Sequence, residues 1–323
     1  MRRAVAAISC ALLMLSAAPG RAADAPPAII VHAGKNDSLS HKLAVQFAEA
    51  LAQGNNALTV EVEESQGSVQ NIIDTLRRSN HYVFTAPPNL IVLAERGQKP
   101  FTRNAHYRTI RALFPVPPLT MHWLVRADSD IRHFGDLAGK SLAPGGKASF
   151  SEGQTVSALH ALGLDKSVQL IDLDPAGAEA ALAAKQVAGI ALAGTFPLPA
   201  VNKLAKTVPI RLLSLSREQL KKVLAADDSL VAETIPKGTY PGQDADVQTV
   251  ALPTGVYTTT AMSEHTAYAI TKAFWSQKWA LGQRNPPWNA VSPASLATLG
   301  VRLHPGALRY YREAGIKVPR ALR

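Results

Sequence analysis

The chain has 323 residues, of which 47% are hydrophobic, with a mean hydropathy near zero and a formal net charge of +10. This length and composition indicate a globular protein with one large or two ordinary cores, and the length favours two domains. The only cysteine, Cys10, lies in an apolar N-terminal segment, so removal of that segment excludes disulfides and a cysteine nucleophile. The basic residues are scattered and form no long or aromatic-interleaved run, which argues against nucleic-acid binding.

The N-terminus has the pattern of a cleavable secretory signal over residues 1–23. Arg2 and Arg3 precede an apolar stretch at residues 4–18, and small residues follow near position 20. A membrane anchor is the weaker alternative, because the run is shorter than the roughly 20 residues that span a bilayer. Lipidation of Cys10 is disfavoured because most of the apolar segment follows it. The sequence thus predicts an exported protein.

The first elements alternate between strand and helix. Residues 28–33 form a short apolar run typical of a buried parallel strand, and apolar residues then recur at helical spacing over residues 39–51. The pattern repeats with a strand at 58–62, a helix that starts at Gly67 and Ser68, and a strand at 81–86. We expect Ser68 to be the N-cap of its helix, because a serine hydroxyl accepts well from a free first-turn amide.

Two segments predict crossings between lobes. Strands are expected at 109–114 and 119–125, separated by the PVPP sequence of residues 115–118, and the second is the outgoing crossing. The segment 233–252 contains four glycines and prolines, which predict an ordered loop, followed by an apolar run that predicts the returning strand.

Between the crossings the same alternation starts again. Strands are expected after Gly139 and at 168–173, 189–193 and 210–213, and helices after Ser149 and at 176–184, 199–205 and 217–225. Ser149 and Glu152 have the spacing of a capping box. Further helices near 263–275, 292–299 and 305–314 complete the chain.

These elements predict an α/β fold with two βαβ-built lobes, a central cleft between them and two hinge crossings. We expect lobe 1 to comprise residues 24–125 plus 250–323, and lobe 2 to comprise residues 126–249.

Ligands of open α/β sheets bind beyond the carboxyl ends of the strands, where helices begin. Four loops meet this description, at residues 34–40, 66–68, 145–152 and 194–199. Their hydroxyls, amides and lysines, with the strand end at Thr85, suit an organic anion held without a metal. The candidate binding residues are Asn36, Ser38, Ser40, His41, Gly67, Ser68, Thr85, Lys147, Ser149, Phe150, Ser151 and Thr195.

Each serine in these loops has an ordinary alternative role as a helix cap. Signatures of catalysis and of cofactor binding are missing: the sequence contains no GxSxG, no GxxxxGK[ST], no GxGxxG and no HExxH. The nine histidines are dispersed, so we expect no enzyme activity, no metal and no cofactor. A hydrolase or transferase would need a nucleophile and a base in contact in the cleft, for instance Ser149 with a histidine.

Several motifs resemble those of the TAXI solute-binding proteins, the extracytoplasmic receptors of a class of TRAP transporters. The most specific are ETIPKGTYPGQDADVQTVALP at 233–253 and LHPGALRYYREAGIKVP at 303–319. Supporting matches are ESQGSVQNIIDTLRR at 64–78, LVRADSDIRHFGDLAGKSL at 124–142 and HALGLD at 160–165.

The resemblance implies a periplasmic binding protein with the two-lobed, type II-like periplasmic-binding-protein fold. Such a protein closes on a small organic anion, such as glutamate or 2-oxoglutarate, and presents it to a TRAP-type membrane permease. Two loops depart from the family pattern: Ser40 and His41 stand where paired tyrosines are usual, and Ala148–Ser151 where Gly-Ser-Gly-Thr is usual. The alternative is a periplasmic ligand-sensing or accessory binding protein that is not coupled to transport.

Overall fold

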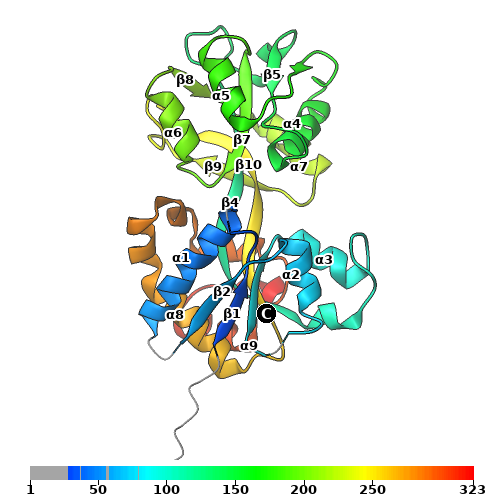
Figure 1. Cartoon of the computed structure of the whole chain (residues 1–323), viewed down its shortest axis with the longest axis vertical. Coiled ribbons are helices and arrows are strands. Elements are labelled where there is room, and N and C mark those ends of the chain that lie inside the picture. Colours follow the sequence, from blue (N-terminus) through cyan, green and yellow to red (C-terminus); the bar gives the residue numbers. More distant parts are fainter. Residues whose placement is uncertain (1–27, 37, 56–57, 79) are drawn as a thin grey trace, which may run out of the picture.

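The computed structural model describes residues 28–36, 38–55, 58–78 and 80–323. The expected signal segment, residues 1–23, lies outside the described residues. Figure 1 shows two lobes, one above the other, joined by the long strands β4 and β10. We call the half that contains β1 lobe 1 and the half that contains β7 lobe 2. In the described part of the chain, no helix is long and apolar enough to cross a membrane.

Lobe 1 contains a sheet in the order β2-β1-β3-β10-β4, in which β1, β2 and β3 are parallel and β10 is antiparallel to its neighbours. Helices cover both faces of this sheet (Figure 1). The strands are β1 (Ile29–His32), β2 (Val60–Glu63), β3 (Tyr82–Ala86), β4 (Ile110–Arg126) and β10 (Val247–Thr259). The helices are α1 (Leu39–Gly54), α2 (Ser68–Asp74), α3 (Pro88–Arg96), α8 (Glu264–Arg284) and α9 (Pro305–Glu313).

In lobe 2 the sheet continues from β4 through β7 and β5 to β6, while β8 pairs with β4 and β9 pairs with β10. The strands are β5 (Ser141–Ala143), β6 (Gln169–Leu170), β7 (Gly189–Gly194), β8 (Ile210–Leu212) and β9 (Val231–Ile235). The helices are α4 (Phe150–Ala161), α5 (Pro175–Ala183), α6 (Pro199–Ala205) and α7 (Arg217–Ala226). Short 3-10 helices include Ala105–Thr109, Phe134–Leu137, Pro286–Ala290, Pro293–Thr298 and Arg320–Leu322.

The two crossings are the antiparallel pair β4 and β10. The prediction of two strands separated by PVPP is wrong, because β4 runs unbroken through residues 115–118. Its register against β10 shifts at this point: Leu119 pairs with Leu252 and Val116 with Thr254, so Pro117 and Pro118 oppose Pro253 alone. A bulge tolerates proline because the extra residues need not donate to the ladder.

Each lobe has its own core. In lobe 1 a single cluster surrounds Phe114 and Phe274, whose rings stack with centroids 3.9 Å apart. In lobe 2 alternate residues of β4 enter different clusters, Trp123 on one face of the sheet and Leu124 on the other. This alternation is expected of a strand buried on both faces. The lobe boundaries at 125/126 and 249/250 fall within β4 and β10, and we retain them as a proposal.

Candidate functional site

A pocket of about 240 Å³ lies where lobe 1 meets the crossing strands. It is formed by the starts of α1 and α2, the end of β3 and the bulged part of β4 and β10. Its lining is mainly apolar, with four hydroxyl groups and, among these described residues, no charged side chain. The lining residues are Leu39, Ser40, Leu43, Ser68, Thr85, Pro87, Val116, Pro117, Leu119, Leu252 and Thr254.

The loop before α1 is held by two serines. Ser38 is the N-cap, and its Oγ accepts from the backbone N–H of His41 at 3.2 Å. The Oγ of Ser40 lies 3.2 Å from that of Ser38. A Cβ at Gly34 would lie 2.7 Å from both hydroxyl oxygens, so the two serine hydroxyls occupy the space left by the missing side chain at the end of β1. The capping role of Ser38 leaves Ser40 as the hydroxyl that faces the pocket.

Lobe 2 repeats this local arrangement before α4. Ser149 is the N-cap and accepts from the N–H of Glu152 at 3.1 Å, and its Oγ lies 3.1 Å from that of Ser151. A Cβ at Gly145 would lie 2.1 Å from the Oγ of Ser151. The glycine at the strand end and the serine pair at the helix start therefore recur in both lobes.

The structure brings only part of the predicted set together. Ser40, Ser68 and Thr85 line the pocket. The other lobe 1 residues lie nearby with separate partners: the Nδ2 of Asn36 donates to the Oε2 of Glu64 at 3.0 Å, and Gly67 has the positive φ of 104°. Ser38 and His41 are joined through the cap described above, and the ring of His41 is not part of the described lining.

The prediction that Ser68 caps α2 is wrong. The helix begins at Ser68 itself, and Gly67 occupies the capping position, with no side-chain hydrogen bond to the first turn in the described residues. This shift by one residue turns the Ser68 hydroxyl from a cap into a lining group of the pocket.

The lobe 2 candidates are separate from this pocket. Lys147 is exposed, Phe150 packs against the lobe 2 core, and Ser151 and Thr195 are buried. Among the described lining residues none comes from the loops at 145–152 and 194–199. The pocket therefore carries the lobe 1 half of the predicted site alone.

Sequence reasoning missed the apolar wall of the pocket. Leu39 and Leu43 lie on α1, where the helical periodicity marks them as core-facing. Leu119 and Leu252 form a cross-strand pair on the crossings, so their side chains share one face. Nothing in the sequence separates such residues from ordinary core positions.

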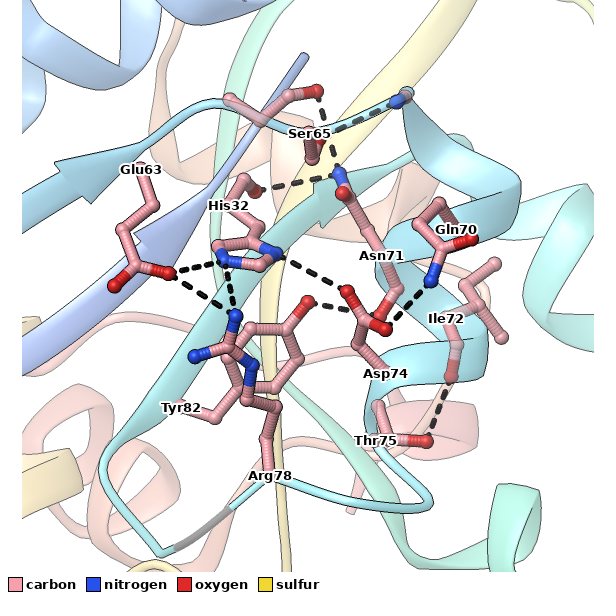
Figure 2. A network of polar contacts seen from close by, with 12 residues as sticks. His32, Glu63, Ser65, Gln70, Asn71, Ile72, Asp74, Thr75, Arg78 and Tyr82 are labelled. Atoms are coloured by element: carbon pink, nitrogen blue, oxygen red, sulfur yellow. Dashed lines mark hydrogen bonds and ion pairs between the residues drawn. The ribbon is translucent and has the colours of Figure 1, made fainter.

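A polar network supports the strand ends beneath the pocket (Figure 2). The Nε2 of the buried His32 lies 2.7 Å from the Oε2 of Glu63, and its Nδ1 lies 3.3 Å from the Oδ2 of Asp74. Arg78 donates from Nη2 to the same oxygen of Glu63 at 3.1 Å. The hydrogen bond with His32, more than the charge of Arg78, holds the pKa of Glu63 below its ordinary value.

Asn71 on α2 connects this network to the pocket. It is fully buried, and its Nδ2 lies within 3.0–3.3 Å of the carbonyl oxygens of His32, Ala33 and Thr85. These carbonyls belong to the carboxyl ends of β1 and β3, from which the Gly34 loop and the Thr85 side chain project. Asn71 thus fixes the spacing of two strands whose ends carry the site.

A second buried contact lies on the lobe 2 side of the crossings. Tyr240 donates from its hydroxyl to the Nε2 of His122 at 2.8 Å and accepts from the N–H of Leu198 at 2.8 Å. Burial lowers the pKa of His122 to about 4, so its ring is neutral at pH 7. Tyr240 anchors the loop of residues 236–246 to β4 and to the start of α6.

In the described residues, no group of three or more histidine, cysteine or acidic side chains is placed to hold a metal ion. The pocket offers hydroxyl groups and apolar surface, which suit a small ligand with a polar end and an apolar body.

The chain is similar to several solved structures. A TctC solute-binding protein from Polaromonas, without ligand, is 12% identical with a TM-score of 0.53, over 88% of this chain and 96% of that one. MatC from Rhodopseudomonas palustris with bound malate is 12% identical with a TM-score of 0.48, over 90% and 98%. The periplasmic sulfonate-binding protein of a putative sulfonate ABC transporter from Methylobacillus flagellatus is 13% identical with a TM-score of 0.48, over 85% and 73%.

The likeness to the TctC protein confirms the predicted two-lobed fold of periplasmic binding proteins. The model of the NMT1-like family matches residues 39–315, which include α1, both crossings and every described residue that lines the pocket. This chain therefore belongs to the NMT1-like family.

Proposed function

We propose that the protein is an extracytoplasmic solute-binding protein that captures a small organic anion between its lobes and delivers it to a membrane permease. The observation that carries the proposal is the pocket at the crossing strands, which combines the hydroxyls of Ser40, Ser68 and Thr85 with an apolar wall. In lobe 2, Ser149 and Ser151 supply a second pair of serine hydroxyls at the start of a helix, as Ser38 and Ser40 do in lobe 1.

The chemistry of the lining supports a carboxylate or amino acid with an apolar portion. A carboxylate accepts hydrogen bonds from serine and threonine hydroxyls, and bonds to a charged group are worth about 1.5 to 3 kcal/mol. The leucines of the crossings would cover the carbon skeleton. A TAXI-type TRAP system is the transporter that the sequence motifs favour, and export by the N-terminal signal is part of this proposal.

Isothermal titration calorimetry against dicarboxylates and amino acids tests the ligand class. For the ligand that binds, Ser68→Ala should weaken affinity by about fivefold or more, because a buried ligand oxygen loses its donor. Its melting temperature should stay close to that of the wild type, since Ser68 caps no helix.

Ser276→Ala is the matched control, because the Ser276 hydroxyl bonds within α8 to the carbonyl of Ala273, away from the pocket. It should leave affinity unchanged. No heat with any member of the panel would contradict the assigned ligand class, and equal losses in both variants would contradict the role of Ser68.

Sensing without transport remains the alternative, and it would use the same pocket. A large multi-span permease encoded beside this chain would favour transport.

A further inference from the structure

A second pocket, distinct from the one at the crossings, lies around the beginning of β4. It has a volume of about 430 Å³ and is lined by residues of α3, of the 3-10 helix Ala105–Thr109, of β4 and of the segment 300–302. Arg111, which lines it, precedes Val116 of the crossing pocket by five residues of β4, about 16 Å of extended strand.

Three arginines and one acid determine the charge of this pocket. Arg108, Arg111 and Arg302 line it together with Glu95, so the side chains carry a net charge of +2. In the described part of the chain, none of these four takes part in an ion pair. Like charges gathered without ion pairs repel one another, and a bound anion would relieve that repulsion.

The backbone holds these groups in place. Ala112 donates to the carbonyl of Arg302 at 2.9 Å, and His304 donates to the carbonyl of Ala112 at 2.9 Å, so the segment 302–304 lies alongside β4. These two backbone hydrogen bonds therefore place Arg302 next to Arg111.

Arg111 is oriented as well as positioned. Its Nη1 donates to the carbonyls of Arg108 and Ile110, both at 2.8 Å. These two bonds use both Nη1 hydrogens, which leaves the Nε and Nη2 donors for another acceptor. Burial, followed by repulsion from Arg302, lowers the pKa of Arg111, while Glu95 opposes this shift. The guanidinium is thus partly desolvated and fixed before any ligand arrives.

We propose that this arginine pocket binds a phosphate group. Guanidinium donors match phosphate oxygens in pairs, three arginines can meet several oxygens of one tetrahedral anion, and the net charge of +2 balances a dianion. The phosphate belongs either to a free small molecule or to the headgroup of a phospholipid. The arginine pocket is separate from the pocket at the crossing strands, so this proposal does not depend on which ligand the crossing pocket binds.

Calorimetry and ³¹P line broadening with inorganic phosphate test the site on the purified protein. The double variant Arg108→Gln/Arg302→Gln, whose two side chains are exposed, should weaken phosphate binding by about tenfold or more. Arg77→Gln is the matched control, since Arg77 is an exposed lobe 1 arginine that does not line this pocket, and it should leave the affinity within about twofold.

Glu95→Gln gives a change of opposite sign. Removal of the one carboxylate raises the net charge of the lining and should tighten phosphate binding severalfold. A variant that had lost its fold could not bind phosphate more tightly, so this result would show that the arginine variants lose binding through their charge.

Sedimentation with vesicles separates the two sources of phosphate. Binding to phosphatidic acid vesicles but not to phosphatidylcholine vesicles, with competition by inorganic phosphate, would assign a lipid headgroup. Binding of inorganic phosphate without vesicle binding would assign a free phosphate compound. The proposal is overturned if inorganic phosphate does not bind, if the arginine variants bind it as the wild type does, or if only an acidic peptide such as polyglutamate binds.

Discussion

Gly34 and Gly145 occupy equivalent places at the ends of β1 and β5, each against the serine pair of the following helix. Sequence alone places the serines near helix starts, because serine is a preferred cap. It does not reveal which hydroxyl caps and which faces the ligand, since that depends on a helix boundary accurate to one residue. Ser38 and Ser149 cap as such residues usually do, whereas Ser68 does not.

The close approach at Gly145 predicts a large stability loss on substitution. In Gly145→Ala the new Cβ would meet the Oγ of Ser151 at 2.1 Å and the carbonyl of Ala191 at 2.5 Å, at a φ of 98°. Left-handed backbone costs about 1–2 kcal/mol and the clash adds about 1–3 kcal/mol. Gly139→Ala, with φ of 75° and nothing within 4 Å, isolates the backbone cost. Urea unfolding should show the larger loss at Gly145, and equal losses would contradict the packing described.

The contribution of Glu63 to the free energy of unfolding should depend on pH. Because the folded-state pKa of Glu63 is lowered, chiefly by its hydrogen bond with His32, the ionised carboxylate stabilises the fold above its ordinary pKa. This contribution disappears as the pH falls through the lowered value. Glu63→Gln should therefore reduce the free energy of unfolding at pH 7, and the difference from the wild type should shrink toward pH 3.

Glu61→Gln on the same strand supplies the control for Glu63, because Glu61 is exposed. A loss at Glu63 that does not change with pH, or an equal loss at Glu61, would show that the network in Figure 2 does not act through the charge of Glu63.

At the scale of elements, periodicity predicted most strands and helices, including the returning strand β10, to within a few residues. It failed where proline has two roles. Pro88 follows β3 directly and begins α3, because its fixed φ and missing donor suit the first helical turn. The PVPP motif predicts a break, but the antiparallel pairing with β10 keeps β4 continuous around a bulge.

The hydroxyl of Tyr240 should stabilise the fold by anchoring the loop of residues 236–246. Tyr240→Phe removes the hydroxyl that joins His122 to the N–H of Leu198, and leaves the buried His122 ring and the partly buried N–H of Leu198 without that partner. The free energy of unfolding should fall by about 1–3 kcal/mol. Tyr310→Phe, which removes a half-buried hydroxyl with no hydrogen bond in the described structure, should have a much smaller effect. Similar losses in both variants would mean that Tyr240 contributes only its ring.

In the whole molecule, the two lobes and the late return of β10 followed from the order of elements along the sequence. The separation of the site into halves did not, because the distance between lobes depends on the geometry of two crossing strands. Three of the predicted residues of lobe 1, Ser40, Ser68 and Thr85, line the pocket, while Ser149 caps α4, which lies in the other lobe (Figure 1). The proposed function requires the lobes to approach each other around the ligand.

The distance between the lobes, with and without ligand, tests this requirement most directly. Cys10 is the only native cysteine, and it lies outside the described residues in the segment that export is proposed to remove. Spin labels can therefore be attached to the double variant Lys42→Cys/Val156→Cys. Lys42 is an exposed position on α1, and Val156 is an exposed position on α4. Pulsed electron–electron double resonance should show a shorter distance between the two spin labels when the ligand identified by calorimetry is added. A ligand that binds while this distance stays unchanged would contradict capture between the lobes.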